Sequence, residues 1–217
     1  MGKKLKIDIL SDSTSWMVAH LSELKDRFEE DGHEVKLLNK AEQLREGDLA
    51  FFLGCFEIVK QEKLALHKNN LVVHASALPN GKGWSPMTWQ ILEDKNEIPV
   101  TLFEAQVGVD SGDIYLQDIV RLSGYELIEE WRDLLGKKIF EMCLNFTKRY
   151  PEILTSARKQ IGNGSFYERR TPECSRLNLD KTLREQFNLL RVVDNARYPA
   201  FFELDGHRYK LKVERYE

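Results

Sequence analysis

Cysteine is scarce in this chain of 217 residues, which has only Cys55, Cys143 and Cys174, far apart in sequence. So few unclustered cysteines give neither a disulfide framework nor a zinc-ligand pattern, and we expect no metal. No stretch approaches the roughly 18 apolar residues needed to cross a membrane, so we expect no membrane partner. The apolar run after the N-terminal lysines stops at Asp8, too short for a signal peptide. We therefore expect a protein of the reducing cytoplasm.

An excess of basic charge is also missing. The chain has 32 basic and 35 acidic residues, a formal net charge of −3, so we expect no nucleic-acid partner. The loop after the first predicted strand lacks the Gly-x-Gly-x-x-Gly run that binds a dinucleotide. NAD binding and Walker-type phosphate binding are therefore excluded.

The first 150 residues alternate between strand and helix patterns. Apolar residues alternate over 5–10, follow a helical stripe over 17–28 and form another short strand over 35–38. Further strands are predicted at 49–53, 71–74, 99–103 and 113–120, and further helices at 60–67, 85–92 and from a capping box at Ser123 and Glu126 to about 150. This predicts an α/β fold, a Rossmann-like open, mostly parallel twisted sheet with helices on both faces.

Residues 151–217 have a different texture and predict a small C-terminal α+β extension to the domain formed by 1–150. A turn or linker is expected at 162–164, and Asp180 as the cap of a helix that carries Leu183, Phe187 and Leu190. Asp205-Gly206 lies between two strand-like runs and predicts a β-hairpin with a tight turn. The charged residues of 168–170 and of 191–197 are interpreted as solvated surface.

Two side chains could carry proton chemistry. His74 ends a buried apolar strand, where open α/β sheets bind ligands, and a histidine there could serve as a proton carrier. The alternative is a core histidine bonded to backbone. Asp110 lies in a glycine-flanked loop that could bring it beside His74, although, taken alone, the residue is better explained as an ordinary turn aspartate. Trp84, after Gly81-Lys82-Gly83, is either a binding platform or a cover for the sheet edge.

Three segments carry a resemblance to a known family: His74-Ala-Ser76-Ala-Leu78-Pro79, then Gly83-Trp84-Ser85-Pro86, then Val109-Asp110-Ser111-Gly112-Asp113. Together they resemble the formyltransferases that use 10-formyltetrahydrofolate. That family includes methionyl-tRNA formyltransferase, glycinamide ribonucleotide transformylase and the nucleotide-sugar N-formyltransferases. The resemblance implies the formyltransferase fold, a folate cosubstrate and an amine acceptor.

The resemblance also implies roles for individual residues. His74 would stabilise the tetrahedral oxyanion or move a proton, Asp110 would hold His74 and accept protons through water, and Ser76 would orient His74 or its loop. The family's asparagine, two residues before the histidine, is Val72 here. Asn70 shares that strand face but lies about 13 Å from His74, too far to replace it. Asn80 or a loop N–H is expected to supply the missing donor.

The family's folate ring lies between two segments that correspond to 54–59 and 106–109 in this chain. Apolar side chains with free backbone polar groups suit a flat heteroaromatic ring. The resemblance therefore implies folate contacts by a set of five residues. These are Phe56, Glu57, Ile58, Gly108 and Val109.

The acceptor is the most open part of the prediction. The stretch from Gly81 to Gln90 is most similar to formyltransferases for nucleotide-linked 4-amino sugars, which implies that Asn80, Lys82 and Trp84 contact a UDP- or dTDP-linked 4-amino-4,6-dideoxy sugar. Such sugars serve surface or flagellar glycans, including the pseudaminic acid type. The C-terminal extension resembles a short element that often dimerises, so a homodimer is possible.

Three alternatives remain open at this stage. One is another amine acceptor, such as an aminoacyl group or glycinamide ribotide. Another is hydrolysis of formyltetrahydrofolate by water. The third is a noncatalytic folate- or sugar-binding homologue, because losing one oxyanion donor typically costs about a hundredfold or more in rate.

Overall fold

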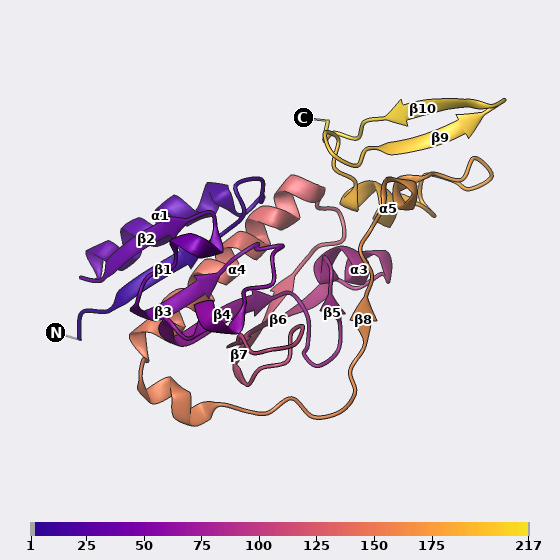
Figure 1. Ribbon diagram of the computed structural model, residues 1–217. Helices are drawn as coiled ribbons and strands as arrows, with labels where there is room; N and C mark the ends of the chain where they lie inside the picture. The colour runs from indigo at the N-terminus through magenta and orange to yellow at the C-terminus, as the bar shows by residue number, and fades with distance from the viewer. Residues whose placement is uncertain (1–2, 217) are drawn as a thin grey trace.

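The computed structural model describes residues 3–216 and has a six-stranded central sheet in the order β2-β1-β3-β4-β6-β7 (Figure 1). The strands are β1 (Lys6–Leu10), β2 (Glu34–Leu38), β3 (Gly47–Phe52), β4 (His67–His74), β6 (Glu97–Glu104) and β7 (Ile114–Arg121). The first four are mutually parallel, whereas β6 is antiparallel to both β4 and β7. The predicted open, mostly parallel sheet is confirmed.

Alternation along the strands divides the core between the two faces of the sheet. On one face, Ile7, Ile9 and Phe51 pack with α1 (Val18–Glu30) and the long α4 (Ile128–Lys148). The helix α3 (Pro86–Leu92) joins the same cluster. On the other face, Ala50 and Phe52 pack with the short helices η1 (Ala41–Gln43) and α2 (Gln61–Leu64). Helices therefore cover both faces, as predicted, but the second cover is thin.

The helix predicted over 60–67 is wrong in its extent. α2 ends at Leu64, and His67 already pairs with Gly47 as the first residue of β4. The imidazole of His67 is buried, and its Nε2 lies 3.4 Å from a carboxylate oxygen of Asp8 on β1. Strand pairing and this buried contact draw His67 into the sheet.

The capping box predicted at Ser123 does not begin the long helix. The Glu126 carboxylate does accept the N–H of Ser123, at 2.6 Å, but it closes a turn in which Gly124 has a φ of +95°. The helix starts at Ile128, with Leu127 as its N-cap and Glu130 accepting the N–H of Leu127 at 2.7 Å. The predicted capping pattern of Ser123 and Glu126 therefore forms the turn that precedes the helix.

Beyond α4 the chain first runs as η2 (Glu152–Ser156) and then in extended form along the sheet, reaching β8 (Phe166–Tyr167) beside β5 (Lys82–Gly83) (Figure 1). It continues through η3 (Pro172–Ser175) to α5 (Phe187–Val192) and a hairpin of β9 (Ala200–Leu204) and β10 (His207–Leu211). Asp205 and Gly206 have φ values of +50° and +79°, as the predicted tight turn requires.

The helix expected from Asp180 is shorter than predicted. The side-chain amide of Gln186 explains the difference. Its oxygen accepts the N–H of Asn178 and its nitrogen donates to the carbonyl of Asn178, which holds residues 178–186 in turns. α5 therefore begins only at Phe187, with Gln186 as its N-cap.

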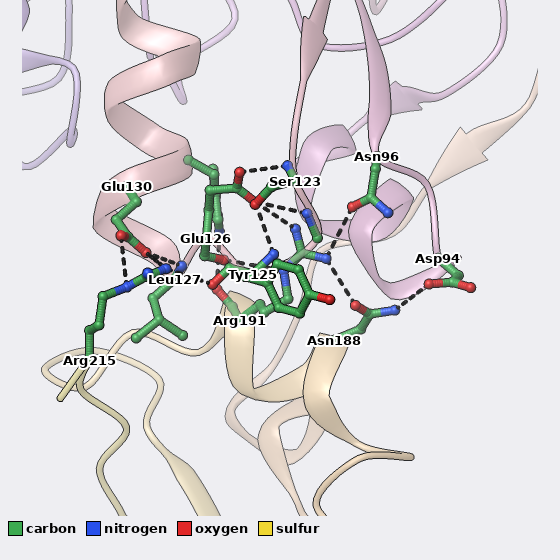
Figure 2. A network of polar contacts seen from close by, with 12 residues as sticks. Asp94, Asn96, Ser123, Tyr125, Glu126, Leu127, Glu130, Asn188, Arg191 and Arg215 are labelled. Carbon is green, nitrogen blue, oxygen red and sulfur yellow. Dashed lines mark hydrogen bonds and ion pairs between the residues drawn. The ribbon is translucent and has the colours of Figure 1, made fainter.

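A buried polar network connects α5 to the rest of the fold by hydrogen bonds and an ion pair (Figure 2). The prediction that Arg191 is solvated is wrong, because its side chain is 1% exposed and lies 3.4 Å from the Glu126 carboxylate. Its guanidinium also donates to the side-chain oxygens of Asn96 and Asn188. Although burial opposes ionisation, the N–H groups of Ser123 and Gly124 lower the pKa of Glu126 to about 2. The network thus pairs two charges that would otherwise be costly to bury.

None of the helices within residues 3–216 is long and apolar enough to span a lipid bilayer.

Candidate functional site

His74 lies at the carboxyl end of β4, the position that the sequence predicted for a ligand-binding histidine. Its side chain is 10% exposed, and Nε2 lies 2.8 Å from the carbonyl oxygen of Gly81 and 3.7 Å from a carboxylate oxygen of Asp110. Because a carbonyl only accepts, Nε2 carries the proton in this contact. The structure therefore brings His74 and Asp110 together across 36 residues of sequence.

Asp110 is held in an unusual backbone conformation. Its φ is +47°, in the left-handed region, and one carboxylate oxygen accepts the N–H of Gly83 at 2.8 Å. Gly112 approaches β6 so closely that a Cβ would lie 1.6 Å from the carbonyl oxygen of Glu104. The loop therefore needs glycine at 112 to place the Asp110 carboxylate beside His74.

A segment beyond the predicted domain boundary completes this site. We call residues 158–170 the strap. The side-chain amide of Gln160 donates to the carbonyls of both Asp110 and Gly112, at 2.9 Å each. The Oγ of Ser165 accepts the N–H of Gly81 at 2.9 Å, and Gly81 in turn accepts from His74. The strap thus supports the backbone around both candidate proton carriers.

The sequence did not predict the strap, because Gly162-Asn163-Gly164 indicated only a turn or linker. Gly164 has a specific reason to be glycine: a Cβ there would lie 2.1 Å from the carbonyl oxygen of Pro79. Gly164 is therefore the residue that could have indicated the strap, because this close approach to the His74 loop requires glycine.

The loop after His74 contains the N–H groups and the asparagine that were expected to supply the missing oxyanion donor. The N–H groups of Gly81, Lys82, Gly83 and Trp84 are all engaged, by Ser165, Asp110 and Tyr167. They are therefore not free to serve a ligand in this conformation. The exposed Asn80 has no side-chain hydrogen bond to the part of the chain that the structure describes.

Trp84 lies between two other side chains. Its ring stacks on Phe56, with centroids 6.1 Å apart and planes at 22°, and the guanidinium of Arg169 lies 4.8 Å from its centroid. Arg169 belongs to the run that the sequence analysis interpreted as a solvated surface. Trp84 therefore connects the 54–59 segment, the His74 loop and the strap.

Ser76 is buried next to this loop. Its N–H donates to the carbonyl of His74 at 2.9 Å, and its Oγ has no hydrogen-bond partner within residues 3–216. Gly81 packs directly against it, because a Cβ at 81 would lie 2.9 Å from the Ser76 Cβ. Ser76 therefore contacts the turn that receives the His74 hydrogen bond.

A cavity of about 320 Å³ opens between α2 and the chain that leaves β6. From the segments expected to bind folate, Gln106 and Val107 line it. The other residues that line it are Gln61, Leu64, Ala65, His67, Asn70, Glu104 and Ala105. The five residues expected to contact folate lie outside that lining, and Phe56, Ile58 and Val109 are exposed by 49%, 75% and 47%. These three side chains are exposed on the loops that follow β3 and precede β7.

Polar groups form one wall of this cavity. The Glu104 carboxylate accepts from the backbone N–H of Asn70 at 2.6 Å, and from Asn69 and Tyr115 at 2.9 Å. Burial raises the pKa of Glu104, and these hydrogen bonds oppose the rise. Burial, with the nearby Asp12 carboxylate, also raises the pKa of Cys55 to about 12, which keeps its thiol protonated and unreactive.

In the described part of the chain, no group of three or more His, Cys, Asp or Glu side chains is arranged to hold a metal ion.

The structure is that of an α/β protein in which a histidine and an aspartate meet beyond the carboxyl end of a central strand, with a mixed polar and apolar cavity lined by other residues. The sequence profile of the formyl transferase family matches residues 17–133, more than half of the chain. The chain belongs to this family.

Individual relatives and solved structures carry different names. The methionyl-tRNA formyltransferase of Clostridium beijerinckii is 26% identical over 177 residues, which cover 81% of this chain and 56% of that protein. A 4-N formyltransferase from Francisella tularensis superposes with a TM-score of 0.73 and 19% identity, covering 100% of both chains. HypX of Aquifex aeolicus, solved with tetrahydrofolic acid, gives 0.78 and 18% identity over 97% of this chain and 38% of that one.

The chain spans about half the length of the curated relatives it matches. The two structural similarities, both under 25% identity, establish the fold.

Proposed function

We propose that this protein transfers the formyl group of 10-formyltetrahydrofolate to the amine of a nucleotide-linked 4-amino-4,6-dideoxy sugar. The observation that carries the proposal is the pairing of His74 with Asp110, at 3.7 Å, beyond the end of β4 and on the same sheet face as the cavity. An amide transfer needs a proton carrier at the reacting carbon, and this pair is suited to that task.

The proposed chemistry moves one formyl group and one proton. The amine nitrogen attacks the formyl carbon, and His74 stabilises the resulting oxyanion through its Nε2–H. The bond between that carbon and N10 of the folate then breaks. The attacking nitrogen loses a proton to Asp110 through water, and Asp110 returns that proton through water to N10. The hydrogen bond from His74 to Gly81 is exchanged for the bond to the substrate oxygen.

Val72 leaves the family's asparagine position without a donor, and we assign the second oxyanion donor to Asn80. The four loop N–H groups that could replace it are already engaged. The exposed carboxamide of Asn80 precedes them directly and is free to turn toward a bound ligand.

Two observations support a nucleotide-linked acceptor. The Trp84 ring lies between the half-exposed ring of Phe56 and the guanidinium of Arg169, and this combination of an exposed aromatic ring with a nearby cation suits a nucleotide base and its phosphates. The chain's net charge of −3 does not favour a large RNA acceptor. Lys82, on the paired strand β5, adds a second cation on the same loop.

A second function, folate or sugar binding without catalysis, is favoured by Val72 alone. Release of tetrahydrofolate separates the two. We would mix the protein with 10-formyltetrahydrofolate and UDP- and dTDP-linked 4-amino sugars, with aminoacyl-tRNA and glycinamide ribotide as competing acceptors. His74→Ala and Asp110→Asn are the test variants, and His207→Ala, on the exposed hairpin, is the control.

Amine-dependent release that is lost in both test variants and retained in the control supports the transferase. Formate released without any amine identifies a hydrolase instead. Binding without turnover for every acceptor contradicts the proposal and favours the noncatalytic function.

A further inference from the structure

One short loop, which carries β5, contacts both candidate proton carriers. The carbonyl of Gly81 accepts the Nε2–H of His74 at 2.8 Å. The N–H of Gly83 donates to a carboxylate oxygen of Asp110, also at 2.8 Å. A neutral imidazole has a single N–H, and the proposed chemistry needs that N–H for the oxyanion and the carboxylate for a proton. In this conformation the loop therefore occupies groups that the reaction uses.

The strap holds this loop by pairing with its backbone. Ser165 contributes two bonds, because its Oγ accepts the N–H of Gly81 at 2.9 Å and its carbonyl accepts the N–H of Lys82 at 3.0 Å. The carbonyl of Tyr167 accepts the N–H of Trp84 at 3.0 Å. The two segments therefore form one small unit around the paired strands β5 and β8. We call this unit the cap, and it comprises residues 81–84 and 165–169.

The two sides of the cap are attached differently. On the side of α3, Tyr167 stacks on Trp89 with ring centroids 6.0 Å apart and planes at 7°. Toward the start of the strap, a Cβ on Gly162 would meet nothing within 4 Å, so the chain can turn there without a clash. The cap can therefore tilt about α3 while Gln160 still bonds the carbonyl of Asp110.

The acceptor surface of the proposed function lies on the same unit. Trp84 belongs to one segment of the cap and Arg169 to the other, and the guanidinium lies 4.8 Å from the centroid of the Trp84 ring. Because Phe56 also stacks on this ring, a nucleotide base that stacks there displaces a neighbour. A ligand that takes the ring and draws Arg169 to its phosphates interacts differently with a closed and a tilted cap. Such a difference is what allows a ligand to shift a conformational equilibrium.

We propose that the cap stays closed on the two proton carriers until the nucleotide part of the acceptor binds Trp84 and Arg169, and that it then tilts and releases them. The inference rests on the proposed function and adds its regulation. A closed cap protects the formyl donor from water. In the unwanted reaction, water attacks the formyl carbon, the bond to N10 breaks, N10 takes one proton of the water, and formate and the other proton leave. Ser165 is the positioning residue that keeps the cap closed.

The test measures formate released from 10-formyltetrahydrofolate when no amine is present. Ser165→Ala removes one hydrogen bond from the closed cap, which is enough to shift a two-state equilibrium about twofold to tenfold, so formate release should rise by that factor. Ser165→Thr keeps the hydroxyl and should match wild type, as should the control Ser22→Ala on the exposed side of α1. A merely structural role for Ser165 would lower both formate release and transfer to the amino sugar.

The wild-type protein gives a second test without any variant. Saturating UDP or dTDP, added without an amine, should tilt the cap and leave water as the only acceptor. We therefore expect formate release to rise at least twofold, to a rate that stays below that of transfer to the amino sugar.

Three outcomes contradict these statements in different ways. A nucleotide that binds without changing formate release, or a Ser165→Ala protein that releases formate at the wild-type rate, overturns the inference while amine-dependent transfer still supports the proposed function. A protein that binds neither nucleotide contradicts the nucleotide-linked acceptor as well. Wild-type formate release that is as fast without nucleotide as transfer is with the amino sugar identifies a hydrolase and overturns both.

Discussion

The support that the strap gives to Asp110 leads to a quantitative prediction. Gln160→Ala removes two hydrogen bonds of 2.9 Å, to the carbonyls of Asp110 and Gly112. Each such bond contributes about 0.5–1.5 kcal/mol, so the loop loses about 1–3 kcal/mol of preference for the conformation in which Asp110 meets His74. If catalysis needs that conformation, kcat falls about fivefold to a hundredfold.

The assay is steady-state tetrahydrofolate release with the preferred amino sugar, together with thermal unfolding. Gln160 is a positioning residue, so kcat should fall while the KM for the folate donor changes little. Lys159→Ala, an exposed neighbour on the strap, is the control and should behave as wild type.

A further variant separates positioning from simple loss of packing. Gln160→Glu keeps the size but points a carboxylate at two carbonyls, so it should lower kcat more than Gln160→Ala does. A Gln160→Ala protein whose kcat stays within twofold of wild type would refute the reasoning that the strap sets the Asp110 geometry.

Three other predictions follow from the same contacts. Gly112→Ala forces a Cβ to 1.6 Å from the Glu104 carbonyl oxygen, so activity should fall sharply and the melting temperature should drop; unchanged melting would contradict the close approach. Glu126→Gln should destabilise the fold at pH 7 by up to about 3 kcal/mol, because the native pKa of about 2 lies below the ordinary 4.5; that difference should shrink as pH falls from 4.5 toward 2 in urea titrations. Arg169→Ala should raise the KM for the amino sugar about tenfold with little change in the folate KM; an equal rise in both would remove Arg169 from the acceptor site.

Local sequence signals were enough to predict the sheet. The alternation around Ile7 and Ile9 and the unbroken apolar run 49–53 predicted β1 and β3, because a strand's side-chain period is set by its own backbone. Helix limits were less accurate. His67 lay in a predicted helix but joins β4, because its pairing with Gly47 and its buried contact with Asp8 are long-range effects.

The candidate site was predictable only where its residues follow a strand or lie in a recognisable motif. His74 and Asp110 met those conditions, and the structure brings them together. Gln160 and Ser165 did not, because a glutamine and a serine in a loop carry no local signal of the backbone that they will reach.

The most direct test of the central claim is single-turnover formyl transfer by wild type and His74→Ala, with donor and nucleotide-linked amino sugar both saturating. Because the variant removes the proposed oxyanion donor and proton carrier, the account predicts formylated sugar from wild type and a rate at least a hundredfold lower from His74→Ala. Equal rates for the two proteins, with intact folding, would contradict it.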